Sequence, residues 1–290
     1  MILSIIIVNW NVKKLLEKCL NSIFKNVDGL DYEVWVVDNN SADGSREYLK
    51  NLIGQNENLK VILNEQNIGF AKANNQALKE AQGEFILLLN PDTEIIGDTL
   101  QKTVQFMQYN QDCGILGSKL IGRDDKIQKS VRSFPTIPSQ AMIFLKLHRF
   151  FYRVKILKNY FQTDFNYEKI SEVDQVMGAF LMTKKEVLEK VGLLDEKFWL
   201  WFEEVDFCKR VREEGYKIIY YPNAAIFHYG AQSFRQMLSC PKQRTYNRST
   251  IYYFKKHSRF ISYWPLLILN PISLFLACLV QIFSFRHESR

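Results

Sequence analysis

The chain has 290 residues, of which 47% are hydrophobic and 14% aromatic, and this composition excludes global disorder. The formal net charge of +7 indicates an anionic partner such as nucleic acid, acidic lipid or a phosphorylated substrate. The five cysteines are widely spaced and contain no C-x-x-C pair, which argues against a disulfide framework or a zinc site and fits a reducing compartment.

Short apolar segments alternate with helical segments from residue 2 to about residue 120. The expected strands are ILSIIIV, YEVWVV, LKVIL, EFILLL and CGILG. The expected helices are residues 12–24, 45–52, 71–81 and 99–108, with Asn11 as the cap of the first. The first residues, MILSIIIVNWN, lack the features of a signal peptide and are expected to form a strand. This order predicts an α/β fold with a mostly parallel sheet between helices.

Polar residues follow the expected strands, at the sheet edge where such folds bind ligands. They are Asn9, the group Asp38, Asn39 and Asn40, and the pair Asn90 and Asp92. A turn explains Pro91 but not a carboxylate, Asp92, at the end of the core strand FILLL. The loop DNNSADGS, residues 38–45, suits an ordinary turn equally well.

The segment NIGFAKANNQ, residues 67–76, has features of a ligand-binding helix start. Gly69 permits close approach of the backbone to a ligand, and Lys72 opens a helix where a phosphate is favoured. The segment is neither a G-x-G-x-x-G motif nor a P-loop, which disfavours dinucleotide and Walker-type sites.

The middle of the chain is basic and less regular. Residues 119–158 carry ten Lys or Arg residues against Asp124 and Asp125, and residues 134–172 are predicted to be an insertion with some helix. A strand, VMGAFLMT, follows, and Thr183 to Glu186 predicts a capping box for a short helix. The segments KIIYYP and AAIFHYG are the last expected strands, and the second ends at His228.

The helix EEVDFCKRVREEG contains a candidate general base. Helical rotation places Glu204 on an apolar face and points Glu203 the other way; the apolar face comprises Trp201, Val205, Cys208 and Val211. A buried carboxylate has a raised pKa and can accept a proton near neutral pH. The alternative is that these acids only stabilise the helix dipole, which describes Glu203 and Asp206 well. Asp206 is also spaced to pair with Arg210.

A single histidine at a strand end, such as His228, is more often structural than a metal ligand. Together with a carboxylate from another strand end, it forms a plausible nitrogen and oxygen site for a divalent cation that holds phosphates.

Seven segments, in this order, resemble the family-two glycosyltransferases, which are inverting enzymes with the GT-A fold. They are VNWN, DNNSADGS, NIGFAKANNQ, LLLNPDTE, MGAFLMTKKE, FWLWFEEVDFCKR and FHYGAQS, and they cover roughly residues 2–235. The NxGFAxxNN and LNPD patterns are most similar to the bacterial rhamnosyltransferase branch. The resemblance implies a domain over residues 1–240, with a nucleotide-binding half to about residue 120 and an acceptor and catalytic half beyond it.

The resemblance also implies roles for single residues. Those implied for the nucleotide are Val8, Asn9, Trp10, Asp38, Asn40, Gly69, Lys72 and Asn90, with Asp38 accepting a hydrogen bond from a uracil or thymine base. Those implied near the acceptor and donor sugars are Gly178, Ala179, Trp201 and Glu203. Glu204 stands at the catalytic base, where aspartate is commoner. Asp92 and His228 stand at positions that contact Mg²⁺ or Mn²⁺, and Asn90 replaces the first acid of the D-x-D motif, which weakens the expected metal binding.

The implied reaction moves a sugar, L-rhamnose from dTDP-rhamnose, to a glycan or polyprenyl-diphosphate-linked acceptor in cell-surface polysaccharide synthesis. The alternatives are a UDP-sugar donor (N-acetylglucosamine, galactose or galactofuranose) and a membrane-attached binding protein that has lost catalysis; a homodimer is also possible. A nucleotidyltransferase is disfavoured because VNWNVKK lacks a glycine, and a nucleic-acid binder because no recognition motif is present.

Residues 241–290 are expected to form a basic, aromatic linker and a membrane-associating segment. Residues 260–285 carry no formal charge and exceed the length that spans a bilayer. Pro265, Asn270 and Pro271 are expected to interrupt a simple single helix. A spanning helix, a surface-lying or re-entrant segment and a soluble core helix are the alternatives, and the expected location is the cytoplasmic face of the membrane.

Overall fold

The structure is a computed structural model that describes residues 1–230 and 238–288. Within this part of the chain, a nine-stranded sheet has the order β3-β2-β1-β4-β10-β6-β11-β5, and β8 pairs with β11 outside this path. The strands of the sheet are β1 (Leu3–Asn9), β2 (Tyr32–Asp38), β3 (Leu59–Leu63), β4 (Phe85–Leu89), β5 (Thr93–Ile95), β6 (Cys113–Ile121), β8 (Ser171–Glu172), β10 (Phe180–Lys184) and β11 (Lys217–His228).

The pairing confirms the predicted α/β fold with a mostly parallel sheet. The pairs β1–β2, β2–β3, β1–β4 and β6–β11 are parallel. Strand β10 is antiparallel to both β4 and β6, and β5 is antiparallel to β11. Segments KIIYYP and AAIFHYG form one strand, β11, whose register against β6 shifts between Tyr221 and Ala225.

Two apolar layers cover the two faces of the sheet. One layer comprises α1 (Lys13–Asn26), α2 (Ser45–Leu52) and α4 (Thr99–Tyr109), and its core includes Leu16, Leu49 and Val104. The other comprises α3 (Phe70–Glu80), α7 (Lys185–Val191) and α8 (Glu203–Glu213), and its core includes Ala77 and Phe207. Residues of β1 alternate between the layers because successive strand side chains point to opposite faces.

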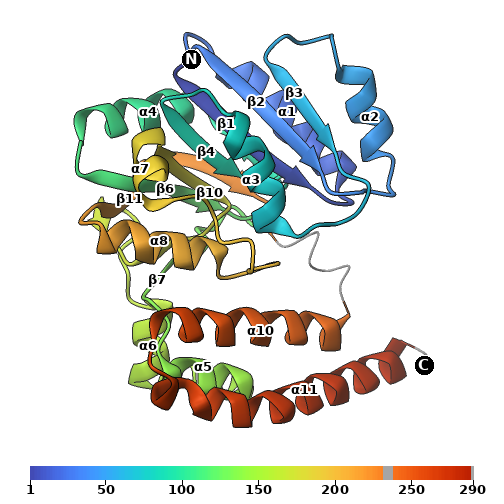
Figure 1. Cartoon of the computed structure of the whole chain (residues 1–290), viewed down its shortest axis with the longest axis vertical. Coiled ribbons are helices and arrows are strands. Elements are labelled where there is room, and N and C mark those ends of the chain that lie inside the picture. The colour runs from blue at the N-terminus through green and yellow to red at the C-terminus, as the bar shows by residue number, and fades with distance from the viewer. Residues whose placement is uncertain (231–237, 289–290) are drawn as a thin grey trace.

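The remaining helices gather below the sheet domain (Figure 1). They are α5 (Ile137–Phe144), the 3₁₀ helix η1 (Leu147–Arg149), α6 (Lys155–Phe161), α10 (Ser239–His257) and α11 (Phe260–Glu288). The first three confirm helix within the expected insertion. A third apolar cluster packs Phe254 and Leu266 of this module against Phe198 and Phe202, which directly precede α8. The short strands β7 (Val131–Arg132) and β9 (Gln175–Val176) pair beside it.

Three local expectations are wrong. Asn11 does not cap α1: Val12 is the N-cap residue, and the Asn11 side chain accepts a hydrogen bond from the Ala42 backbone. The segment from Thr183 to Glu186 is not a capping box, because the Thr183 hydroxyl donates to the Gly114 carbonyl instead.

The third concerns the C-terminal segment. Helix α11 is continuous over 29 residues with Pro265 and Pro271 inside it, so the prolines do not interrupt it. Packing against α10 and α5 holds the helix together where each proline removes one backbone hydrogen bond. By length and composition, residues Phe260–Gln281 are sufficient to cross a membrane.

Candidate functional site

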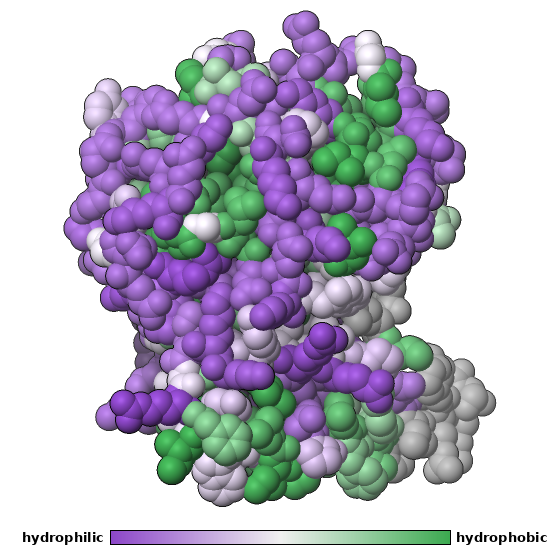
Figure 2. Space-filling view, in the orientation of Figure 1, coloured by the Kyte–Doolittle hydropathy of each residue, from purple (hydrophilic) through white to green (hydrophobic). Residues whose placement is uncertain are grey.

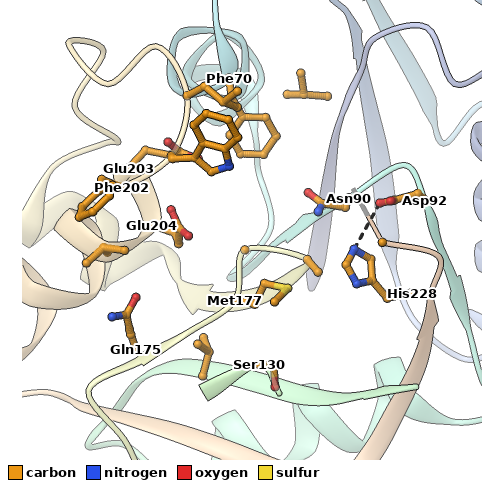
Figure 3. A pocket seen from close by; sticks show the side chains of 18 of the residues that line it. Phe70, Asn90, Asp92, Ser130, Gln175, Met177, Phe202, Glu203, Glu204 and His228 are labelled. Carbon is orange, nitrogen blue, oxygen red and sulfur yellow. Dashed lines mark ion pairs between the residues drawn. The ribbon is translucent and has the colours of Figure 1, made fainter. Parts of the chain in front are cut away.

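A cavity of about 480 Å³ opens at the carboxyl ends of β1 and β4, between the sheet, α8 and the lower helices (Figure 3). The predicted site residues that line it are Val8, Trp10, Gly69, Asn90, Asp92, Gly178, Ala179, Trp201, Glu203, Glu204 and His228. The fold therefore brings together residues from strand ends that are more than 200 positions apart. This arrangement follows the rule that α/β sheets bind ligands at the carboxyl ends of their strands.

Four predicted nucleotide-binding residues do not line this cavity: Asn9, Asp38, Asn40 and Lys72. Asn40 and Lys72 are exposed. Asp38 is fully buried, and its carboxylate accepts hydrogen bonds from the Asn9 side chain at 2.9 Å and the Ser41 backbone at 2.9 Å. These bonds tie the ends of β1 and β2 to the following loop. The nucleotide-binding roles of these four residues stay predictions.

Asp92 and His228 meet on one wall of the cavity because β5 pairs with the end of β11. Thr93 lies opposite His228 in the ladder, and the Tyr229 backbone donates to the Asp92 carbonyl at 2.8 Å. His228 Nδ1 lies 2.7 Å from Gln128 Oε1, so Nδ1 carries the proton and donates it. Nε2 then presents a lone pair 3.5 Å from Asp92 Oδ1 (Figure 3).

This geometry fits a divalent cation held by two protein ligands. Nε2 of His228 is buried without a hydrogen-bond partner among the described residues. Two ligand atoms that are each about 2.1 Å from one ion lie about 3.0 to 3.5 Å apart. Asn90 lies beside this pair (Figure 3). At this position the D-x-D motif has an acid, so the site has an amide in place of a second carboxylate. Among the described residues, no group of three or more His, Cys, Asp or Glu residues forms a metal cluster.

Glu203 and Glu204 lie on the opposite wall, at the first turn of α8. The expectation that Glu203 points away is wrong, because both glutamates line the cavity and Glu203 is only 5% exposed. Helix α8 begins at Glu203, so Trp201 precedes it and is not part of its apolar face. Figure 3 shows Glu204 projecting into the cavity.

The two carboxyl groups are electrostatically coupled. Burial, together with the adjacent charge of Glu204, raises the pKa of Glu203 well above its usual range. Burial also raises the pKa of Glu204, but backbone N–H groups and the nearby Arg132 charge oppose this rise. The Oε2 atoms of Glu203 and Glu204 have no hydrogen-bond partner among the described residues. The directions of these effects favour the proton on Glu203 and the negative charge on Glu204.

Arg132 is a site residue that sequence reasoning missed. It lies on β7, lines the cavity, and places its guanidinium 5.9 Å from the ring centre of Tyr160 and 5.5 Å from that of Phe161. Burial lowers its pKa, but the polar rings of Tyr160 and Tyr246 and the charge of Glu204 outweigh burial and raise it. The only signal in the sequence was its membership of the basic stretch at residues 119–158.

The loop before α8 is shaped by close packing on Gly69. The Phe70 backbone donates to the Trp199 carbonyl at 2.7 Å, and a Cβ atom on Gly69 would lie 2.6 Å from the Trp199 ring. Trp201 and Phe202 have φ angles of 63° and 72°, in the left-handed region that is strained for such residues. The predicted close approach at Gly69 is therefore made by Trp199 of the chain itself.

Among curated relatives, the chain is 26% identical over 231 residues to the low-salt glycan biosynthesis hexosyltransferase Agl10 of Haloferax volcanii, covering 74% of this chain and 63% of that protein. It is 22% identical over 247 residues to an N-acetylglucosaminyl-diphospho-decaprenol L-rhamnosyltransferase of Mycobacterium tuberculosis, covering 80% of this chain and 77% of that protein. The chain spans 27% to 63% of the length of the first five curated relatives that it matches.

A solved structure of similar fold is the mannosyltransferase PcManGT from Pyrobaculum calidifontis, in complex with GDP-Man and Mn²⁺. The TM-score is 0.58 at 17% identity, over 95% of this chain and 72% of that one, and the likeness confirms the GT-A fold. Residues 4–192 match the family described as Glycosyl transferase family 2. Because this match covers well over half of the 290 residues, the chain belongs to glycosyl transferase family 2.

Proposed function

We propose that the protein is an inverting glycosyltransferase that moves a sugar from a nucleotide-diphosphate sugar to an acceptor hydroxyl. The observation that carries this proposal is the pair of facing walls in one cavity. Glu204 projects from one wall, and Asp92 and His228 meet on the other. A base and a diphosphate site that face each other across a sugar-sized space suit a single displacement.

In this reaction Glu204 accepts the proton of the acceptor hydroxyl. The hydroxyl oxygen forms a bond to the anomeric carbon from the face opposite the diphosphate. The bond between that carbon and the diphosphate oxygen breaks, its electron pair leaves with the nucleoside diphosphate, and the anomeric configuration inverts. Glu203 holds the proton of the buried pair, and its carboxyl group donates a hydrogen bond that positions the sugar. Gly178 borders Glu204, since a Cβ atom on it would lie 3.7 Å from that side chain, in ordinary van der Waals contact.

Asp92 and His228 are the residues that would hold Mg²⁺ or Mn²⁺, with Asn90 beside them. When bound, the cation would neutralise negative charge on the departing diphosphate. Gln128 Oε1 accepts a hydrogen bond from His228 Nδ1 and so keeps Nε2 available. With a single carboxylate in this pair, we expect the cation to bind weakly without the donor diphosphate and more tightly with it.

For the substrates, we propose dTDP-L-rhamnose as the donor and a polyprenyl-diphosphate-linked sugar as the acceptor in cell-surface polysaccharide synthesis. Support comes from the mycobacterial relative named as a diphospho-decaprenol L-rhamnosyltransferase, which the chain matches over most of both lengths. Arg132, the one arginine or lysine among the described residues of the cavity, offers a positively charged partner for an acceptor diphosphate. We place the reaction on the cytoplasmic face of the membrane, in keeping with the five free cysteines.

The test is a nucleotide-release assay on the purified chain with a panel of dTDP- and UDP-sugars, a polyprenyl-diphosphate sugar acceptor, and either Mn²⁺ or EDTA. We expect acceptor-dependent release from dTDP-rhamnose that falls about 10²- to 10⁴-fold in Glu204→Gln, while nucleotide binding is retained. Loss of release in EDTA and in His228→Ala would support the cation site. Nucleotide release from a UDP-sugar and from no dTDP-sugar would mean that the donor is that UDP-sugar and not dTDP-rhamnose. Nucleotide binding without release from any donor would favour a binding protein that has lost catalysis.

A further inference from the structure

Helix α11 turns its polar side chains toward the protein and exposes most of its large apolar side chains. Asn270 accepts a hydrogen bond from Asn247 of α10 at 3.0 Å, Ser273 is fully buried, and Gln281 accepts from the Cys240 backbone at 3.0 Å. The exposed residues over 260–281 are apolar except for Ser262; the large ones are Phe260, Ile261, Trp264, Leu267, Ile268, Ile272, Phe275 and Val280. A surface helix in water has the opposite arrangement.

A second exposed segment, RFFYRVKI at residues 149–156, runs from the last residue of η1 into the first turn of α6. All eight of its residues are exposed, with Phe150 at 78% and Phe151 at 53%. Three basic residues alternate with the apolar ones: Arg149, Arg153 and Lys155. Helix α5 contacts both α6 and α11 at the lower end of the molecule (Figure 1), and Figure 2 shows hydrophobic side chains gathered over this end.

The packing of α11 argues against a helix that crosses a bilayer. Its contacts with α10 run from Tyr263, which packs with Phe254, to Gln281, which bonds to Cys240. Helix α10 therefore lies alongside the whole stretch, and its exposed residues include Arg244, Arg248 and Lys255. If α11 crossed the membrane, these charges would enter the hydrocarbon, where each costs several kcal/mol. If α11 lies flat, they stay in water.

The charge pattern points to an anionic lipid surface as the occupant. Residues 126–163 contain no Asp or Glu, so the basic side chains of residues 149–156 have no acidic neighbours in sequence. Aromatic side chains interleaved with Arg and Lys are typical of segments at the headgroup level. A protein partner would more often be met by a surface with both signs of charge and with polar side chains at its rim.

We propose that the exposed face of α11 and residues 149–156 form one membrane-binding surface, which lies in the interface of an anionic bilayer without spanning it. The module that carries this surface also borders the cavity, through Tyr160 of α6 and Tyr246 of α10. The site is thus held beside the bilayer, where a lipid-linked acceptor lies. The membrane contact does not depend on the transfer chemistry, and vesicle binding by an inactive chain would still uphold it.

Depth measurements with spin labels test the flat orientation. Single cysteines replace Phe151, Trp264 and Phe275 in a full chain that carries Cys240→Ser and Cys278→Ser, and Ile53→Cys serves as a distant exposed control. On vesicles containing phosphatidylglycerol we expect labels at 151, 264 and 275 at one shallow depth and the label at 53 in water. A spanning helix would separate 264 from 275 by about 16 Å in depth, at about 1.5 Å per residue, and that result would overturn the proposal.

Vesicle flotation tests the two parts of the surface and the lipid charge. We expect Phe151→Asp and Ile268→Asp each to weaken vesicle binding by on the order of tenfold, and Ile53→Asp to leave it unchanged. Arg153→Glu should weaken binding to anionic vesicles and not to neutral ones. Melting curves verify that each variant is folded. Unchanged flotation of both apolar variants, or a dimer in solution that these variants dissociate, would instead assign the face to another occupant.

Discussion

At the scale of single residues, the properties of the site arise from two neighbouring carboxyl groups that share a buried first helical turn. Neither glutamate could be assigned a protonation state from helical periodicity, because the deciding neighbours lie elsewhere in the chain. Arg132 is 72 positions from Glu204, yet its charge opposes the rise in the Glu204 pKa that burial causes. The assignment of Glu204 as base therefore depends on tertiary contacts.

A pH profile checks this assignment. Because Glu204 must be ionised to accept a proton and its pKa is raised, we expect kcat/KM to fall as the pH decreases through that raised pKa. Arg132→Gln removes the charge that opposes this rise, so the acidic limb should move to higher pH. Glu57→Gln, at an exposed position, is the control and should leave the profile unchanged. An acidic limb that does not move in Arg132→Gln would contradict the assignment of Glu204 as the base.

Gly69 gives a prediction about stability. Its φ of 89° and ψ of 164° are tolerated almost only by glycine, and a Cβ atom would also clash with Trp199. We expect Gly69→Ala to lower the free energy of unfolding by about 1 to 3 kcal/mol and to weaken donor binding. Gly54→Ala is the matched control, since Gly54 has φ 82° with no atom near the new methyl group. Equal losses in urea titrations of both variants would mean that the Trp199 contact is unimportant.

At the scale of elements, the orientation of α8 is set by a buried ion cluster that joins it to α10. Asp206 is fully buried and lies 2.8 Å from each of three partners: Arg210 on its own helix, and Lys256 and His257 on α10. The sequence spacing predicted the Arg210 pair correctly. The two partners on α10 come from about 50 residues away and were not predicted.

Asp206→Asn tests this connection. Burial alone raises the pKa of Asp206, but its bonds to His257, Lys256 and Arg210 outweigh burial and lower it. A lowered pKa means that the carboxylate stabilises the fold above the usual Asp range, and that this contribution is lost as the pH falls. We expect Asp206→Asn to cost about 3 to 5 kcal/mol at pH 7 and progressively less in acid, measured by urea unfolding. The exposed pair at Asp98 provides the control, where Asp98→Asn should have no measurable effect.

At the scale of the whole molecule, we propose two functions for α11 that use opposite faces. Its inner face completes the apolar cluster that supports the loop before α8, and its outer face meets the membrane in the proposal above. Two adjacent leucines separate these functions: Leu266 is fully buried, and Leu267 is 40% exposed.

The two leucines make a matched pair of variants. We expect Leu266→Ala to reduce the free energy of unfolding by about 2 to 5 kcal/mol, because it leaves a cavity in the core. Leu267→Ala should change stability by less than about 0.5 kcal/mol but weaken vesicle flotation more than Leu266→Ala does. Thermal melting and flotation of the two variants measure both effects. If the same variant has the larger effect in both assays, the two faces of α11 do not have separate functions.

Local patterns determined much of this protein. The alternation of apolar strands and amphipathic helices over the first 120 residues predicted the sheet. The spacing of apolar residues that distinguishes a strand from a helix is visible within each element. Asp92 and His228 were singled out because each stands at the end of a strand, and strand ends converge on one edge of a sheet. Glu204 was singled out because helical rotation places it on the apolar face of its helix. These inferences require no knowledge of which segments pair.

Only the tertiary structure decided the rest. The antiparallel placement of β10 between β4 and β6, the contribution of Arg132, Tyr160 and Tyr246 to the cavity, and the outward direction of the apolar face of α11 all depend on contacts between residues far apart in sequence. Composition identified residues 260–285 as apolar, but it could not show which face of the helix packs against the rest of the protein. The neighbours in space of a side chain set its burial, its pKa and its partner, and those neighbours are chosen by the packing of the whole chain.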